Sequence, residues 1–172
     1  QLEYEATYSY GKLEGETRAY YSNGQIKAVE HYKDDEPNGT FTQYYPNGQI
    51  ETTYNVGAKD EVFSITSYSC TGKTTREGQI RNNELYGKNS YKYPNGTISS
   101  IDNYNEKGML EGESTTYFRN GNPDQKIIYN NGDVVGIQTY STSGLLRFRT
   151  ISKNGNIVSA ESLNPDNTVK ET

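Results

Sequence analysis

Residues 39–54 read GTFTQYYPNGQIETTY. Two strand-like runs, Thr40–Tyr45 and Gln49–Tyr54, flank the dipeptide Asn47-Gly48. Asn-Gly between alternating segments is the strongest short-range hairpin signal, because both residues tolerate the positive φ of a type I′ turn. The stretch therefore predicts an antiparallel β-hairpin with a two-residue turn.

The same pattern recurs along the chain. It reads GETRAYYSNGQIKAVEHY from Gly15, GKNSYKYPNGTISSIDNY from Gly87 and GESTTYFRNGNPDQKIIY from Gly112. The spacing between successive turn glycines is 24, 24, 24, 25 and 23 residues, and these glycines are Gly24, Gly48, Gly72, Gly96, Gly121 and Gly144. Such a period indicates a repeat array. We predict one domain, 1–172, with repeats at 10–32, 33–56, 57–80, 81–104, 105–129 and 130–152 and a degenerate C-terminal cap at 153–172.

The composition favours strands over helices throughout. No stretch shows a period of 3.6, glycine is frequent, and the abundant Tyr, Thr and Ile favour strands. Leu, Ile, Val and Phe make up only 29 of 172 residues, so neighbouring hairpins rather than a thick core must supply the stability. The predicted fold class is all-β: tandem antiparallel hairpins in an elongated, twisted single-sheet meander or solenoid.

Pairing across the predicted turn assigns the two faces of the sheet. Counted from the turn glycine, position −3 would face +2, −4 would face +3, and −9 would face +8. The face with −3, −7 and +2 carries large apolar residues, and the glycines at −9 lie opposite the aromatic or valine residues at +8. That face is the predicted core. Pro46 at −2 would pair with +1 but lacks the amide hydrogen of a tight ladder, so a wider loop is the alternative. A symmetric four-residue loop keeps these faces, whereas a one-residue bulge exchanges them. We expect Phe41, Tyr45, Ile50 and Ile98 to be buried there.

The opposite face carries a tyrosine at −4 in five repeats, and these residues form what we call the tyrosine row: Tyr20, Tyr44, Tyr68, Tyr117 and Tyr140. The fourth repeat has Lys92 instead. The predicted partners at +3 are polar: Lys27, Glu51, Thr75, Ser99, Asp124 and Arg147. We expect Tyr20, Tyr44 and Tyr117 to be much more exposed than the core residues. The row either stabilises neighbouring hairpins or forms a binding platform, and the two roles are compatible.

No catalytic or metal-binding signature is present in the sequence. His31 is the only histidine and Cys70 the only cysteine, and neither has the partners that catalysis requires. A net charge of −5 with a pI near 5.0 and no basic cluster argues against nucleic acid and anionic lipid. We predict no enzyme activity, no catalytic residue, no metal and no cofactor.

The repeat unit resembles the MORN-variant repeat, in particular that of the bacterial YwqK-type antitoxin family. The residues that carry the resemblance are Gly15, Tyr20, Tyr21, Asn23, Gly24, Ile26 and Tyr32 with their counterparts Gly39, Tyr44, Tyr45, Asn47, Gly48 and Ile50, and again Gly87, Tyr93, Asn95, Gly96, Ile98 and Tyr104, then Gly112, Tyr117, Asn120, Gly121 and Tyr129. The resemblance covers roughly residues 10–152. It implies a protein that binds and neutralises a toxin, although a repeat scaffold does not by itself fix its ligand.

The expected function is a non-catalytic, protein-binding repeat scaffold of antitoxin or immunity type, a monomer whose partner is a protein such as a basic toxin. The alternatives are a secreted or cell-surface bacterial module that binds a glycan or another surface ligand through the tyrosine row, and a membrane-associated MORN-type module. Because the chain begins with Gln1 rather than Met, we expect a processed or trimmed bacterial protein, either cytoplasmic or exported with its signal peptide removed.

Overall fold

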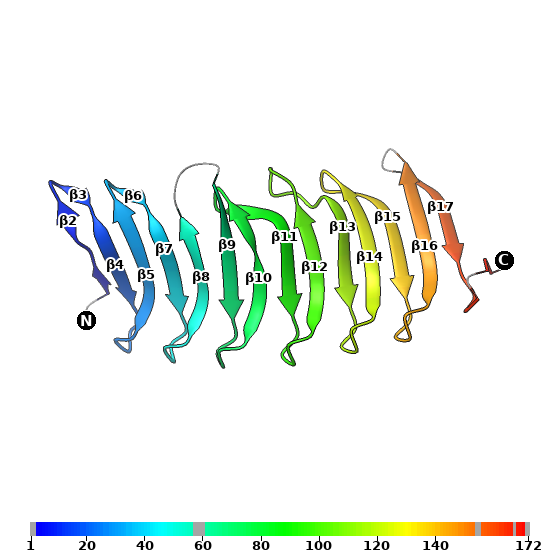
Figure 1. The fold of residues 1–172 in the computed structure, drawn as a ribbon, viewed down its shortest axis with the longest axis horizontal. Coiled ribbons are helices and arrows are strands. Elements are labelled where there is room, and N and C mark those ends of the chain that lie inside the picture. The colour runs from blue at the N-terminus through cyan, green and yellow to red at the C-terminus, as the bar shows by residue number, and fades with distance from the viewer. Residues whose placement is uncertain (1–2, 57–60, 154–155, 167, 171–172) are drawn as a thin grey trace. The chain divides into compact units, whose positions relative to one another are not determined.

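The computed structural model describes residues 3–56, 61–153, 156–166 and 168–170, and every regular element within them is a β-strand. The strands pair antiparallel with their neighbours, so the all-β class and the hairpin repeats are confirmed (Figure 1). Residues 57–60, where the third repeat is predicted to begin, lie outside the described residues. No helical segment of the described chain has the length and hydrophobicity that crossing a bilayer requires.

The chain divides into two compact units, and the first spans Gln1–Asn83. Its sheet runs in the order β1-β4-β5-β7-β8-β9-β10, with β6 paired to β5 and with β2 and β3 paired to each other. The strands are β1 (Tyr4–Glu5), β2 (Tyr8–Ser9), β3 (Lys12–Leu13), β4 (Gly15–Tyr20), β5 (Ile26–Lys33), β6 (Glu36–Pro37), β7 (Gly39–Tyr44), β8 (Ile50–Val56), β9 (Val62–Tyr68) and β10 (Thr74–Arg81).

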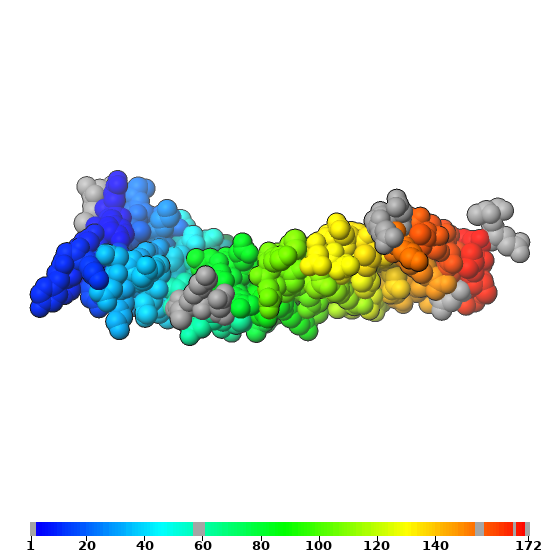
Figure 2. All heavy atoms as spheres, turned by 90° about the horizontal axis from the view of Figure 1, so that it is seen from above, coloured from blue at the N-terminus to red at the C-terminus, as the bar shows by residue number. Residues whose placement is uncertain are grey.

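The second unit spans Glu84–Thr172, and its strands pair in chain order from β11 to β17. They are β11 (Glu84–Lys92), β12 (Ile98–Tyr104), β13 (Gly112–Tyr117), β14 (Pro123–Asn130), β15 (Asp133–Tyr140), β16 (Leu146–Lys153) and β17 (Asn156–Ser162). Apart from the two-stranded sheet of β2 and β3, the described strands of each unit belong to one sheet. The space-filling view shows no second layer of described residues packed over the strands of either unit (Figure 2). A single layer leaves both faces of each sheet open to ligands.

The turns at the repeat glycines are one residue longer than the sequence pattern predicts. The amide of Tyr45 donates to the carbonyl of Gln49 at 2.8 Å, and the amide of Gly48 donates to the carbonyl of Tyr45 at 2.9 Å. The loop is therefore Pro46-Asn47-Gly48, and Gly48 adopts a φ of 83°. This is the three-residue hairpin loop whose last residue is left-handed, rather than a type I′ turn.

The longer loop shifts the pairing next to the turn and leaves it unchanged further away. Gly39 pairs with Val56, as predicted for −9 and +8, but Tyr44 pairs with Ile50 because the register shifts between Gln43 and Tyr44. The same shift occurs in the hairpins at Gly24, Gly96, Gly121 and Gly144. Position +2 is thus the partner of −4, not of −3.

The predicted burial is wrong next to the turns for this reason. Ile50 and Ile98 are 38% and 39% exposed, whereas we expected them in the core. Phe41 and Tyr45 are half-buried, and so are Tyr20, Tyr44 and Tyr117, which we expected to be much more exposed. The bulge places each +2 residue opposite the tyrosine row, and a single-layer sheet cannot enclose either face.

Burial is greater in the middle of the strands, and position −7 is buried in four of the six hairpins. Thr17, Ile65, Asn89 and Ser114 occupy this position and are all buried, with Asn89 at 0% exposure. Their cross-strand partners at +6 differ from repeat to repeat, since Thr17 pairs with Glu30 and Ile65 pairs with Gly78. Of the apolar −7 residues that the sequence predicts in the core, Ile65 is buried, whereas Phe41 and Ile137 are half-buried.

Candidate functional site

The tyrosine row occupies the ends of strands, immediately before the turns. Tyr20, Tyr44 and Tyr68 are the last residues of β4, β7 and β9 in the first unit. Tyr117 and Tyr140 end β13 and β15 in the second unit. All five are half-buried. Each unit thus presents its own series of tyrosines at one register position, three in the first unit and two in the second.

The cross-strand partners of the row are mostly apolar, which corrects the prediction of polar partners. Tyr20 pairs with Ile26, Tyr44 with Ile50, Tyr117 with Pro123 and Tyr140 with Leu146. In the fourth repeat Lys92 pairs with Ile98, and in the third Tyr68 pairs with Thr74. The polar residues at +3 are displaced because the bulge leaves position +3 without a partner on the neighbouring strand. Each unit therefore carries a partly exposed stripe of aromatic and aliphatic side chains.

The hydroxyl groups of the row differ in their hydrogen bonds. Tyr20 Oη donates to Glu5 Oε2 at 2.6 Å, and Tyr140 Oη donates to Gln138 Oε1 at 2.7 Å. The hydrogen bond to Glu5 raises the pKa of Tyr20. The hydroxyls of Tyr44, Tyr68 and Tyr117 make no hydrogen bond to any residue that the structure describes. Those three hydroxyls are available to a ligand.

The backbone of the row is fixed by the tyrosines at −3. Tyr21 Oη donates to the carbonyl of Tyr44 at 2.6 Å, and Tyr45 Oη donates to the carbonyl of Tyr68 at 2.9 Å. In the second unit Tyr93 Oη donates to the carbonyl of Tyr117 at 2.6 Å. Each bond joins one repeat to the next, and we call them the inter-repeat hydrogen bonds. The sequence signal for them is the repeated pair of adjacent tyrosines, although the sequence pattern predicts only a packing role for the second tyrosine of each pair.

The turn asparagines make a second set of bonds between repeats. Asn47 Nδ2 donates to the carbonyl of Cys70 at 2.8 Å, and Asn120 Nδ2 donates to the carbonyl of Thr142 at 2.7 Å. The Oδ1 atom of Asn47 also accepts from the amide of Gln49 at 3.1 Å. The asparagine side chain therefore accepts a hydrogen bond within its own turn and donates one to the turn of the next repeat. Together with the tyrosine hydroxyls, these bonds fix the spacing of the row.

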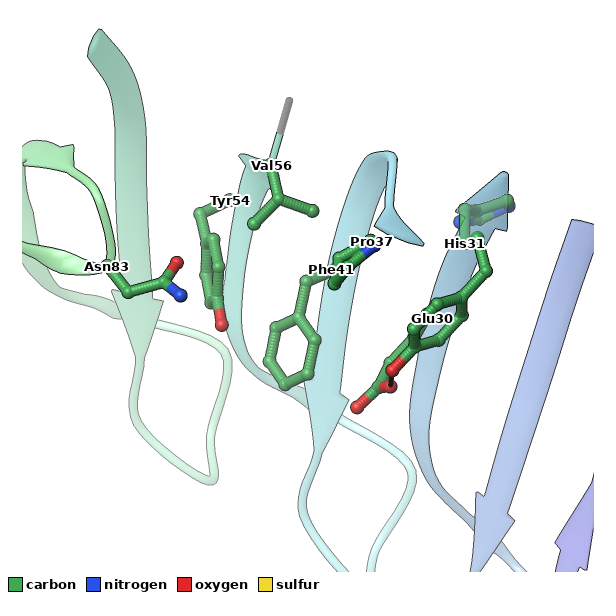
Figure 3. A pocket seen from close by; sticks show the side chains of 8 residues that line it. Glu30, His31, Pro37, Phe41, Tyr54, Val56 and Asn83 are labelled. Carbon is green, nitrogen blue, oxygen red and sulfur yellow. Dashed lines mark hydrogen bonds between the residues drawn. The ribbon is translucent and has the colours of Figure 1, made fainter. Parts of the chain in front are cut away.

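A pocket lies on the opposite face of the first unit, between the second strand of one hairpin and the next hairpin. It has a volume of about 150 Å³ and is lined by Glu30, His31, Tyr32, Pro37, Phe41, Tyr54, Val56 and Asn83. In Figure 3 the rings of Phe41 and Tyr54 stand side by side, and the carboxylate of Glu30 lies beside Phe41. The two ring centroids are 4.6 Å apart, with an interplanar angle of 32°. We call this the aromatic pocket.

The pocket combines a carboxylate with tyrosines that stay neutral. Tyr32 Oη donates to Glu30 Oε2 at 2.7 Å. This hydrogen bond, with a further contribution from burial, raises the pKa of Tyr32 to about 12. Burial, and after it the charge of Glu30, raises the pKa of Tyr54. Both phenols therefore remain protonated at physiological pH. Sequence reasoning missed this site because Glu30 and Phe41 belong to different repeats.

Replacing Glu30 by glutamine is expected to lower the pKa of Tyr32 from about 12 toward 10, because the carboxylate is the main cause of the shift. The pKa is measured by NMR of tyrosines labelled at the ring carbon that bears the hydroxyl. Because the folded pKa lies above the unfolded value, the stabilisation by this group is complete below pH 10 and lost as the pH rises toward 12. Glu113→Gln, in β13 of the second unit, should leave this pKa unchanged, and an unchanged pKa in Glu30→Gln would contradict the assignment.

His31 contacts a backbone carbonyl and a carboxylate, and Cys70 is a free thiol. His31 Nδ1 lies 2.8 Å from the carbonyl oxygen of Thr40, and its Nε2 lies 3.7 Å from Glu16 Oε2. Cys70 is exposed beside a turn. Within the described part of the chain, no group of three or more His, Cys, Asp and Glu side chains is placed to hold a metal ion.

Comparison with known families gives a match at three of the predicted repeats. The MORN repeat variant model matches residues 13–34, 37–56 and 110–131. The first two segments contain the hairpins at Gly24 and Gly48, and the third contains the hairpin at Gly121. The MORN-variant resemblance predicted from the sequence is thus confirmed for these three segments. No curated protein sequence matches this chain.

Two solved structures are similar to parts of this chain. One is described as the crystal structure of TarM, with 13% identity, a TM-score of 0.39 and coverage of 62% of this chain and 21% of the other. The second is a point mutant of S. aureus TarM in complex with fondaparinux, alpha-GlcNAc-glycerol and UDP, with 8% identity, a TM-score of 0.35 and coverage of 82% and 22%. The chain spans about a fifth of the length of either structure.

Proposed function

We propose that the protein is a non-catalytic, protein-binding repeat scaffold that holds its partner along the tyrosine row. The observation that carries this proposal is the pairing of the row with partly exposed aliphatic side chains. Tyr44 lies opposite Ile50, which is 38% exposed, and the Tyr44 carbonyl is held by the hydroxyl of Tyr21. A partner therefore meets an apolar stripe whose backbone is already fixed.

Both parts of this arrangement favour binding to a protein. Tyrosine offers a large contact area and loses little side-chain entropy, because only two torsions become fixed. A preorganised surface also avoids the free-energy cost of ordering a loop when the partner binds. The charged residues next to the stripe, such as Lys27 and Glu51, supply the polar rim that surrounds the apolar centre of a typical interface.

We place this scaffold in the antitoxin or immunity class, with a basic protein as its partner. The match to the MORN repeat variant supports a repeat-based binding module. The net charge of −5 favours association with a positively charged partner, as many toxic nucleases would be. The aliphatic residues opposite the row favour a protein over a glycan, because they give sugar hydroxyls no hydrogen-bonding groups. Loss of a hydrolytic or transfer activity in His31→Ala would overturn the non-catalytic assignment.

The test is affinity capture of the partner from the source cell with a triple variant, in which Tyr20, Tyr44 and Tyr68 are replaced by serine. The parent protein is expected to recover a stoichiometric protein partner, and the variant to bind it at least about tenfold more weakly. Loss of the partner's apolar contacts with three tyrosine rings is the physical reason. Circular dichroism and the thermal midpoint establish that the variant is folded.

Two further variants sharpen the result. Tyr8 and Tyr10 are strongly exposed outside the row, so their joint replacement by serine is the matched control and should not affect binding. Ile50→Lys changes an exposed side chain of the stripe, so it should weaken binding with little effect on stability. Equal binding by the parent, the triple variant and Ile50→Lys would mean that the row is only structural.

A further inference from the structure

We propose that the aromatic pocket is a binding site for a primary alkylammonium group, namely a lysine side chain of a protein. The site goes beyond the function proposed for the tyrosine row and lies on the other face of the sheet. Phe41 and Tyr44 both belong to β7 and are three residues apart, so the alternation of side chains along a strand points them to opposite faces. The two sites can therefore be tested separately.

The first argument is the charge of Glu30. Its Oε2 atom accepts a hydrogen bond from Tyr32, which is a neutral donor, and the residue is half-buried. Among the described residues, Glu30 forms no ion pair with a Lys, Arg or His side chain. A partly buried carboxylate without a counter-charge attracts a cation, and here the attraction acts at the wall of a pocket.

The aromatic rings supply the second argument. The side chains of Tyr32, Phe41 and Tyr54 all line the same pocket as Glu30. A cation near the face of an aromatic ring is attracted by the ring's electron density, and the attraction is stronger where water is excluded. Because both tyrosines stay protonated at physiological pH, the pocket combines neutral rings with a single negative charge.

The third argument is that the fold does not require aromatic residues here. Phe41 and Tyr54 form the −7/+6 pair of their hairpin. The same pair is Ile65 with Gly78 in the next hairpin of the unit, and Ser114 with Ile127 in a hairpin of the second unit. The hairpin therefore also forms with small or aliphatic residues at −7 and +6. In the hairpin at Gly48, where this pair lines a pocket together with Glu30 of the preceding hairpin, both residues of the pair are aromatic.

The size and polarity of the pocket define the ligand class. A volume of about 150 Å³ is below the ~300–1,000 Å³ of sites that enclose whole small molecules, so the pocket fits one side chain or headgroup. Glu30 and Asn83 supply oxygen acceptors at its wall. A primary ammonium donates N–H bonds to such acceptors, whereas a quaternary ammonium has none. These acceptors favour a lysine side chain over a choline headgroup.

The test is an NMR titration of the full chain with three probes: Nα-acetyl-lysine methylamide, the uncharged Nα-acetyl-norleucine methylamide, and choline chloride. We expect the lysine probe to shift the resonances of Phe41 and Tyr54 and to bind at least about tenfold more tightly than the other two. It should also lower the pKa of Tyr32, since the ammonium competes for the Glu30 carboxylate. Equal binding of the norleucine probe, or tighter binding of choline, would overturn the proposal.

Substitutions assign the effect to the pocket. Glu30→Gln retains the size of the side chain and a hydrogen-bond acceptor for Tyr32, and it should weaken binding of the lysine probe at least about tenfold. Phe41→Leu should weaken it several-fold. Glu113→Gln, in β13 of the second unit and outside the pocket lining, is the control and should bind as the parent does. Undiminished binding in Glu30→Gln, or no binding of the lysine probe to the parent, would also overturn the proposal, while the partner-capture result for the tyrosine row would be unaffected.

Discussion

Replacing Tyr45 by alanine is expected to lower the free energy of unfolding by about 2–4 kcal/mol, since it removes both a half-buried ring and a hydrogen bond between repeats. The bond from Tyr45 Oη to the carbonyl of Tyr68 joins the hairpin at Gly48 to the next one. Tyr45→Phe keeps the ring and should lose only about 1 kcal/mol. Urea-induced unfolding followed by circular dichroism measures both changes.

Tyr44→Ala is the matched control for this prediction. Tyr44 is the adjacent residue and is also half-buried, but its hydroxyl makes no hydrogen bond to the described residues, and its carbonyl is retained in alanine. We therefore expect Tyr44→Ala to be less destabilising than Tyr45→Ala. Equal unfolding free energies for the two alanine variants would show that the inter-repeat hydrogen bond contributes nothing.

Replacing Gly48 by valine is expected to cost about 1–3 kcal/mol of stability through the backbone alone. Gly48 has a φ of 83°, a conformation that a β-branched residue adopts only with strain. A Cβ built at Gly48 has no atom within 4 Å, so a steric clash with neighbouring residues makes no contribution. Thermal unfolding of the variant gives the size of the effect.

Gly48→Asn separates the conformational explanation from any other effect of adding a side chain. Asparagine is the residue that best tolerates this region after glycine, so its cost should be well below that of valine. If the asparagine and valine variants lose the same stability, positive φ is not the cause. Gly24 and Gly96 have nearly the same φ and equally open surroundings, and they should respond in the same way.

The repeat array and its hairpins were predictable from the sequence because the signals are local and occur many times. The period of the turn glycines located the hairpins, and the glycines at −9 located the pairing far from the turn, as in Gly15 with Tyr32. The length of the turn was not predictable. Asn47-Gly48 satisfies both a two-residue turn and a three-residue loop, because each needs a left-handed residue at the glycine.

That single ambiguity accounts for the unexpected exposure of Ile50 and Ile98. One extra residue in the loop moves Ile50 from the partner of Tyr45 to the partner of Tyr44, where the side chain is partly exposed. Pro46 indicates a wider loop, because a two-residue turn would pair it with Gln49 and proline has no amide hydrogen to donate in that pair. The sequence alone does not show whether the chain accommodates the proline by opening the turn symmetrically or by forming a bulge.

The tyrosine row was found in the sequence with its five members correctly placed at one register position. Its apolar partners were not found, because they depend on the bulge. The aromatic pocket was missed for a different reason. The position of Phe41 within its own repeat predicts a core residue, but the pocket also needs Glu30 of the preceding repeat. A comparison of aligned repeats does not show contacts between unlike positions.

The bonds from the tyrosine hydroxyls and turn asparagines also bear on how such a chain evolves. Tyr45 donates to the repeat that follows, while the carbonyl of Tyr44 accepts from the repeat that precedes. A tandem duplication of this segment in the gene would therefore insert a hairpin that already carries both the donor and the acceptor it needs. The array can lengthen without compensating mutations, and the copied −7/+6 pair is then free to diverge toward another ligand.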